Sequence, residues 1–303
     1  MDQIQVSSFE PAEALWRGPA FAVQHPRKLK GPFVFASPHS GRDYPPSFVA
    51  ASKLDALMIR RSEDSYVDEL FAEAPAHGWP LLSANFPRAY VDANREPFEL
   101  DPEMFVSKLP SFVNTRSLRV AGGLGTIARV VADGQEIYRH KLSFEEVERR
   151  IRELYEPYHD ELRKLVADAH HKFGCAALID CHSMPSVGGP MDQDAGLTRA
   201  DVVLGDRHGS SCAGELTSFV EEAFRDLGYS VARNAPYAGG FTTERYGKPL
   251  HGIHALQIEL NRALYMDEAT LEKKPGFQDL QADLANLTER LAHLDIEPMA
   301  AVL

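Results

Sequence analysis

The sequence predicts a single-domain α/β fold, with a mixed, mostly parallel central sheet and helices on both faces. Short apolar segments alternate with amphipathic segments of helical period. No repeat or low-complexity linker divides the chain, and its 303 residues are enough to bury a large core. The weakly patterned residues 1–30 are expected to form an N-terminal arm on the surface of one domain, residues 31–303.

The first half of that domain contains fewer regular elements than the second. Residues 33–37 form an apolar segment that Pro38 stops, so a short buried strand is expected there. A helix is predicted over residues 62–74 and a strand within residues 79–97. Residues 98–142 are rich in proline and glycine, which predicts loops that cover part of the domain.

The second half shows clear helix–strand steps. Ser143 and Glu146 have the spacing of a capping box, and an apolar stripe follows it, which predicts a helix over residues 144–172 with a kink or break at Pro157. Gly174 ends this helix, and a strand over residues 175–180 follows. A helix over 214–227 and strands over 229–233 and 254–260 complete the pattern.

Charge and composition exclude several classes of protein. The net charge of −12 does not suit nucleic-acid binding. No apolar segment approaches the roughly 18 residues that a membrane span needs, and no signal peptide is recognisable. The three cysteines include no C-x-x-C pair, which fits a reducing compartment. A cytoplasmic protein is therefore expected, and its oligomeric state stays open.

Polar residues that can bind a metal follow or interrupt three of the predicted strands. His39 and His182 lie at the ends of two strands, and Glu259 lies on a third. Carboxyl ends of neighbouring strands meet at one sheet edge, where ligands bind in such folds. Two imidazoles and one acid suit a catalytic zinc ion. We predict Asp64 as the third ligand, with Glu63 as the alternative.

Other residues suit catalysis and substrate binding. Glu259 is the candidate general base, although an ion pair with Arg262 or Arg245 would also explain it. A guanidinium grips a carboxylate through two parallel hydrogen bonds, so Arg95 with its neighbour Asn94 is a candidate carboxylate clamp. The remaining candidates for substrate binding are Arg88 and, in the loop 236–249, Gly240, Thr243 and Arg245. His159, His170 and His171 are expected at the surface or at a helix end.

Several motifs, taken together and in this order, resemble the N-formylglutamate amidohydrolase family over residues 30–270. They are SPHSGRDYPPSF, EDSYVDELF, VDANREP, YEPYHDEL, DCHSMPS, GGFTTERYG and GIHALQIELNRALYMDE. The resemblance implies a zinc-dependent amidase with a carboxypeptidase-like fold. Its typical reaction cleaves N-formyl-L-glutamate to formate and glutamate, the last step of one route of histidine breakdown.

The resemblance also implies roles for individual residues. His39 and His182 match the metal histidines, and Asp64 matches a recurrent acid. Asn94 and Arg95 resemble a carboxylate clamp, and Glu259 resembles the general base. Glu244 and Arg245 stand where the family's deformylases have a basic pair, and NREP replaces NRP, so the preferred acyl group is open.

Two alternatives remain at this stage. The same site could hydrolyse another N-acyl amino acid or a peptide-like substrate. The chain could instead be a non-catalytic binder of an anionic metabolite. Retention of Glu259 together with both histidines favours an enzyme over a binder.

Overall fold

A seven-stranded sheet forms the centre of the protein, whose computed structural model describes residues 16–131, 134–190 and 192–300. The strand order is β1-β3-β2-β6-β9-β7-β8. The strands are β1 (Phe21–Gln24), β2 (Phe33–Ser37), β3 (Leu81–Ala84), β6 (Ala176–Met184), β7 (Val202–Gly205), β8 (Val231–Arg233) and β9 (Ile253–Asn261). The pairs β1–β3 and β7–β9 are antiparallel and the other four are parallel. The predicted fold class is therefore confirmed.

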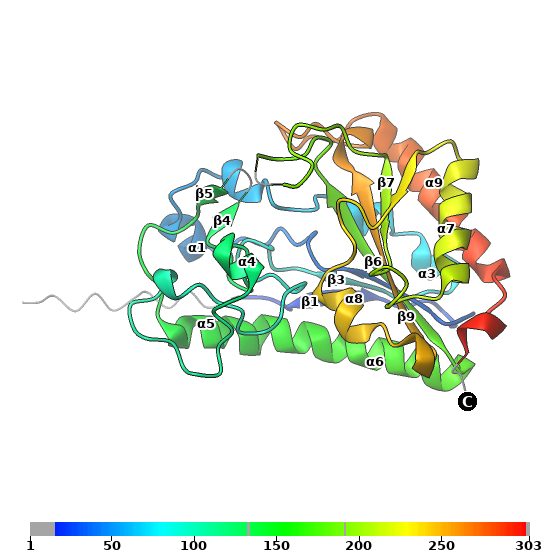
Figure 1. The fold of residues 1–303 in the computed structure, drawn as a ribbon, viewed down its shortest axis with the longest axis horizontal. Coiled ribbons are helices and arrows are strands. Elements are labelled where there is room, and N and C mark those ends of the chain that lie inside the picture. Colours follow the sequence, from blue (N-terminus) through cyan, green and yellow to red (C-terminus); the bar gives the residue numbers. More distant parts are fainter. Residues whose placement is uncertain (1–15, 132–133, 191, 301–303) are drawn as a thin grey trace, which may run out of the picture.

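Helices pack on both faces of this sheet (Figure 1). Alternate side chains of a strand point to opposite faces, so β2 contributes to both cores. Val34 and Ala36 pack in a cluster with α6 (Glu156–Phe173), whereas Phe33 and Phe35 pack in a cluster with α7 (Gly214–Asp226) and α9 (Gly276–Arg290). Both faces of the central strands are thereby buried, which explains their continuous apolar sequences.

Shorter elements complete the described chain. The other helices are α1 (Pro46–Ala51), α2 (Val67–Leu70), α3 (Ala74–His77), α4 (Leu118–Ala121), α5 (Phe144–Arg150) and α8 (Phe241–Tyr246). The short strands β4 (Val130–Val131) and β5 (Gln135–Glu136) pair with each other. Single 3₁₀ turns span Met58–Arg60, Pro102–Met104, Pro249–His251, Arg262–Leu264, Leu291–His293 and Glu297–Met299. No helix in these ranges is long and apolar enough to cross a membrane.

The long helix continues past Pro157 instead of breaking there. The Ser143 hydroxyl accepts from the backbone N–H of Glu146, as the capping box predicts. A π-helical turn, Ile151–Tyr155, then joins α5 to α6, and the three segments run as one rod along the sheet (Figure 1). In an α-helix the proline ring would clash with the carbonyl four residues earlier. The wider π turn lies at that point and accommodates the ring.

Three sequence-based boundaries differ from the structure. The prediction of one continuous helix over residues 62–74 is wrong, because Tyr66 has a left-handed φ of 68°. Only the short helices α2 and α3 form there, and α3 ends at His77, beyond the predicted range. The strand at 175–180 extends to Met184, because β9 pairs with it as far as Asn261. The expected arm, within the described residues 16–30, contains β1 at the sheet edge; residues 1–15 lie outside the described chain.

Candidate metal centre and active site

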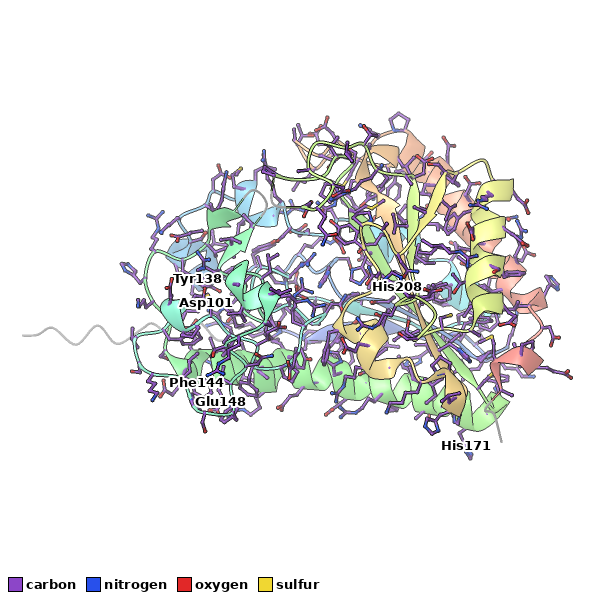
Figure 2. All side chains as sticks on the ribbon, viewed as in Figure 1. Asp101, Tyr138, Phe144, Glu148, His171 and His208 are labelled. Atoms are coloured by element: carbon purple, nitrogen blue, oxygen red, sulfur yellow. The ribbon has the colours of Figure 1, made fainter. Side chains whose placement is uncertain are left out.

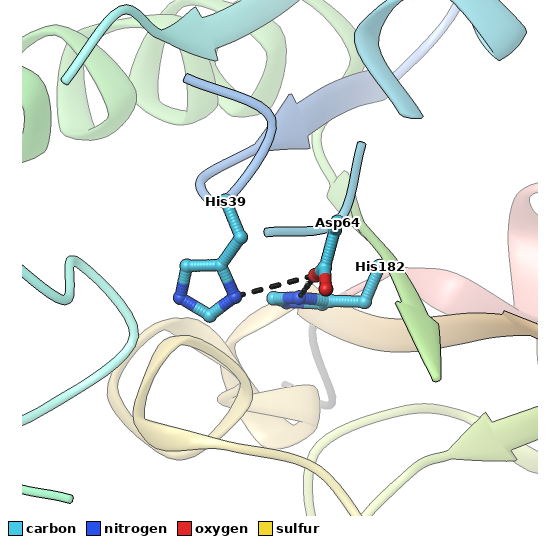
Figure 3. Close-up of side chains that lie close together, drawn as sticks. All are labelled: His39, Asp64 and His182. Atoms are coloured by element: carbon cyan, nitrogen blue, oxygen red, sulfur yellow. Dashed lines mark hydrogen bonds and ion pairs between the residues drawn. The ribbon is translucent and has the colours of Figure 1, made fainter. Parts of the chain in front are cut away.

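His39 and His182 come together because the strands that carry them are neighbours. β2 and β6 run parallel, with Ala36 opposite Asp180. His39 follows β2 and His182 lies near the end of β6, so both reach the same sheet edge. Their buried rings have centroids 4.8 Å apart (Figure 3). Gly41 permits this loop path, since a Cβ there would lie 2.1 Å from the Phe86 carbonyl oxygen.

Asp64 completes the group from the loop before α2. Its Oδ2 lies 2.9 Å from Nδ1 of His182 and 3.3 Å from Nδ1 of His39 (Figure 3). Its Oδ1 accepts a hydrogen bond from Nη2 of Arg262 at 2.9 Å. The carboxylate of Glu63 instead accepts from Arg60 and Ser65. The structure therefore brings Asp64, rather than Glu63, to the two histidines.

His39, Asp64 and His182 have the arrangement and the charge that suit a bound cation. One ligand atom from each lies within 4.8 Å of the others. Nδ1 of His39 is buried without a hydrogen-bond partner in the described chain, which leaves it available as a ligand. Burial acts to raise the pKa of Asp64, but the hydrogen bond from His182 and the adjacent imidazole of His39 hold that pKa well below its ordinary value. The buried carboxylate thus depends on nearby positive charge, which a metal ion would supply.

Two further carboxylates lie behind the histidines. Oδ1 of Asp92 lies 2.7 Å from Nε2 of His39, and Oδ1 of Asp180 lies 3.1 Å from Nε2 of His182. Metal-binding histidines commonly donate their second N–H to a carboxylate, which directs the other nitrogen to the metal. Asp92 makes such a hydrogen bond, whereas Asp180 lies at ion-pair distance without a hydrogen bond among the described residues; neither residue was predicted in this position. That general preference for a carboxylate partner is the signal that could have found them.

Glu259 lies beside His182, because the two residues are register partners on β9 and β6. Its side chain is buried on the same strand face as Gln257, whose Nε2 donates to Oε1 of Glu259 at 2.8 Å. Burial, with a smaller contribution from Asp64, raises the pKa of Glu259 to about 7. A carboxyl group with such a pKa can accept and return a proton near neutral pH.

The predicted carboxylate-binding residues lie next to this centre. Nδ2 of Asn94 is 3.2 Å from Nε2 of His182. Arg95 donates to the backbone carbonyls of Asn94 and Leu124, and its Nη2 lies 3.7 Å from Asp92. Burial lowers the pKa of Arg95 to about 10. Arg88 also reaches Asp92, through Nε at 3.0 Å, so one carboxylate connects His39 with both arginines.

The glycine-rich segment, residues 236–249, packs against Asn94 and forms one wall of the same region. It was expected as a loop but contains the short helix α8. Gly240 packs against Asn94 so closely that a Cβ would lie 2.4 Å from Nδ2, and Thr242 N donates to Oδ1 of Asn94. Thr243 is buried and its hydroxyl donates to the Gly240 carbonyl. Arg245 is exposed and lies over the ring of Phe241, away from these contacts.

Two residues of the long helix support the Asn94 segment, and sequence reasoning missed both. Nε2 of His159 donates to the Ala93 carbonyl at 2.9 Å, and the Tyr155 hydroxyl donates to the Arg95 carbonyl at 2.7 Å. His159 is buried, so its expected surface position is wrong; its place on the apolar stripe beside Tyr155 and Tyr158 was the available signal. His171 and His208, labelled in Figure 2, are exposed.

Comparison with known proteins identifies the family. A sequence model of the N-formylglutamate amidohydrolase family matches residues 31–266. The chain belongs to this family. It is 30% identical to an N-formylglutamate deformylase of Pseudomonas aeruginosa over 273 residues, which covers 89% of this chain and 93% of that protein. It is 27% identical to an N-formylglutamate deformylase of Pseudomonas putida over 240 residues, covering 78% and 82%.

A solved structure supports the same conclusion. The crystal structure of N-formylglutamate amidohydrolase from Ralstonia eutropha matches with a TM-score of 0.83 and 37% identity, covering 90% of this chain and 97% of that one. The family resemblance predicted from the sequence is therefore confirmed, and the protein is assigned to the amide hydrolases. The family match spans every residue of the centre from His39 to Glu259, whereas α9 lies beyond it.

Proposed function

We propose that this protein is a zinc-dependent amidohydrolase that converts N-formyl-L-glutamate and water into formate and L-glutamate. The names of its relatives support this substrate. The observation that carries the proposal is the convergence of His39, Asp64 and His182 beside the buried carboxylate of Glu259. As the family resemblance implies, the reaction would contribute to histidine breakdown.

His39, Asp64 and His182 would hold the metal ion. Two imidazoles and one carboxylate are a donor set of catalytic zinc sites. When bound, the ion supplies Lewis-acid chemistry toward a carbonyl oxygen and a water molecule. Asp92 keeps the His39 imidazole in the orientation that presents Nδ1 to the centre, and Asp180 lies 3.1 Å from Nε2 of His182. Arg262 holds the far oxygen of Asp64, so Oδ2 faces the histidines.

Glu259 would transfer the proton. It accepts one proton from the attacking water as the new C–O bond forms at the formyl carbon. It then gives that proton to the leaving nitrogen as the C–N bond breaks. Its raised pKa suits both steps, because the carboxylate form accepts the proton and the acid form releases it near neutral pH.

The substrate carboxylates would bind among Arg88, Arg95 and Asn94. Asn94 contacts His182, and both arginines contact Asp92, the partner of His39, so a carboxylate bound there would place the adjacent amide at the centre. Gly240 and Thr243 would act by shaping the wall that holds Asn94. The exposed Arg245 would contact the substrate only from the surface, beside Phe241.

The direct test measures metal content and formate release together. The purified protein should contain about one zinc ion per chain and release formate from N-formyl-L-glutamate faster than it cleaves the N-acetyl or N-succinyl analogues. His182→Ala should lose both the zinc and the activity. Glu259→Gln should retain zinc but turn over about 10²- to 10⁴-fold more slowly, the usual contribution of a general base.

The exposed His171 offers a matched control, because His171→Ala removes an imidazole away from the centre. It should keep normal zinc content and activity. Full zinc content and normal turnover in His182→Ala would refute the proposed metal site. Preference for an N-acetyl or N-succinyl substrate would keep the site and change the reaction. Zinc binding without hydrolysis of any of these substrates would favour the non-catalytic binder.

A further inference from the structure

Gln257 is a buried amide at the centre of the sheet that the proposed chemistry does not use. It lies on β9, two residues before Glu259 on the same strand face, and its side chain is only 3% exposed. Burying an amide is unfavourable unless its polar atoms are hydrogen-bonded. The two hydrogen bonds that the Gln257 side chain makes therefore show what this amide contributes.

The two bonds fix the orientation of the amide. Oε1 of Gln257 accepts from the backbone N–H of Gly240 at 2.9 Å. A backbone N–H can only donate, so the oxygen must face Gly240 and the amide nitrogen must face the other way. That nitrogen, Nε2, donates to Oε1 of Glu259 at 2.8 Å.

The bond to Glu259 restricts a carboxylate that could otherwise rotate. The last torsion of a glutamate side chain has a broad, roughly two-fold energy profile. In the described part of the chain, Gln257 is the single hydrogen-bond donor to Glu259. With Oε1 held by Gln257, the free oxygen is Oε2, which leaves one defined site for proton transfer.

Gly240 is itself held firmly, so it can act as a fixed reference for this arrangement. It packs against the Asn94 amide, and Thr243 donates to its carbonyl oxygen at 2.8 Å. The chain of contacts therefore runs from the glycine-rich wall through Gln257 to the Glu259 carboxylate.

We propose that Gln257 is a positioning residue that orients Glu259 for proton transfer by holding its Oε1 against the fixed N–H of Gly240. This inference rests on the proposed function, in which Glu259 is the general base. Gln257 acts through Glu259, so its loss should lower kcat and leave KM and zinc content nearly unchanged. A misplacement of about 1 Å can lower an enzyme rate about 10²-fold.

The test combines Gln257→Met with Glu259→Gln in a double-mutant cycle. Gln257→Met keeps the side-chain volume and removes both hydrogen bonds, and it should lower kcat for N-formyl-L-glutamate about 10- to 100-fold. In the Glu259→Gln background the same change should lower kcat less than about three-fold, because the effects of residues that act as one unit are not additive. A merely structural role for Gln257 would give the same factor in both backgrounds.

A second variant and a control keep the inference falsifiable. If Gln257→Met fails to fold, Gln257→Asn retains a polar amide but is one methylene shorter, so it cannot reach both partners and should also lower kcat. Thr288→Val removes a buried hydrogen bond within α9, outside the site, and should leave kcat unchanged.

The outcomes separate the inference from the proposed function. Wild-type kcat in both Gln257 variants, or equal losses with and without Glu259, would overturn the role of Gln257 while the amidohydrolase reaction stands. Absence of turnover in the wild-type protein would overturn the proposed function and this inference with it.

Discussion

Acidification from pH 7.5 to pH 5 should destabilise the protein through His159. This imidazole is buried on α6 against the Asn94 segment, with the Tyr246 hydroxyl at 3.0 Å from Nδ1 and the Ala93 carbonyl at 2.9 Å from Nε2. Burial lowers its pKa from 6.5 to about 4. The folded protein therefore keeps His159 neutral at pH values where the unfolded chain protonates it.

The sign and size of the effect follow from this difference. The unfolded state binds the proton more readily, so stability falls as the pH falls below 6.5, and the decline ends near the folded-state pKa of about 4. Across this range, each pH unit corresponds to about 1.4 kcal/mol of unfolding free energy. His159 should therefore lower the free energy of unfolding by about 2 kcal/mol at pH 5 and by about 3 kcal/mol in full.

His159→Gln provides the comparison, because glutamine can still donate to the Ala93 carbonyl and does not titrate. Urea unfolding followed by circular dichroism should give free energies of unfolding for both proteins at pH 7.5 and pH 5. Between pH 7.5 and pH 5, the free energy of unfolding of the wild type should fall by about 2 kcal/mol more than that of His159→Gln. His171→Gln, exposed on the same helix, should show no such shift. A difference between wild type and His159→Gln that stays constant with pH would refute the reasoning.

Three further predictions concern the site. Asp92→Asn should weaken zinc binding about 10- to 100-fold in a chelator competition assay, since it removes the carboxylate behind His39; unchanged affinity would show that Asp92 does not support this ligand. Because Glu259 must be ionised to act as a base, kcat/KM should fall about ten-fold per pH unit below its pKa of about 7. A bound cation would move that fall to lower pH, and a rate that increases toward acid would contradict the assignment. Gly240→Ala should raise KM for N-formyl-L-glutamate, because the new methyl group would displace the Asn94 amide. Gly214→Ala is the control, since a Cβ there meets open space, and it should leave KM unchanged. Equal KM values for the two variants would exclude a role of Gly240 in substrate binding.

Local patterns in the sequence were sufficient for the elements that carry the strongest signals. The capping box at Ser143, the apolar stripe after it and the glycine at 174 predicted the long helix to within a few residues. The strand β9 was predicted with Gln257 and Glu259 on one face, and the structure places Leu256, Ile258 and Leu260 in the opposite core. These features depend on neighbours within a few positions, so they are visible without a fold.

Other features failed because they depend on contacts between distant segments. The helix over 62–74 has a suitable composition, yet packing imposes a left-handed residue at Tyr66 and leaves Asp64 in a loop at the histidines. A kink or break was expected at Pro157, but a π-helical turn before it lets the helix continue, and no local pattern indicated that turn. The strand β7 and the helix α9 were not predicted, although α9 carries buried Phe277, Leu280, Leu284 and Leu287 at helical spacing.

The sequence by itself determined which chemistry was available: apolar strands that end in imidazoles and a third that carries a carboxylate, because these are local patterns of residue type. The tertiary structure decided which acid joins the two histidines, which carboxylate orients His39 and which histidine of the long helix is buried. Asp64 and His182 are 118 positions apart, yet their side chains lie 2.9 Å from each other. Parallel pairing of β2 and β6 brings His39 to the same edge as His182, and the backbone N–H of Asp64 donates to the His39 carbonyl at 3.1 Å. Such proximity is set by strand order and register, which no short segment of sequence contains.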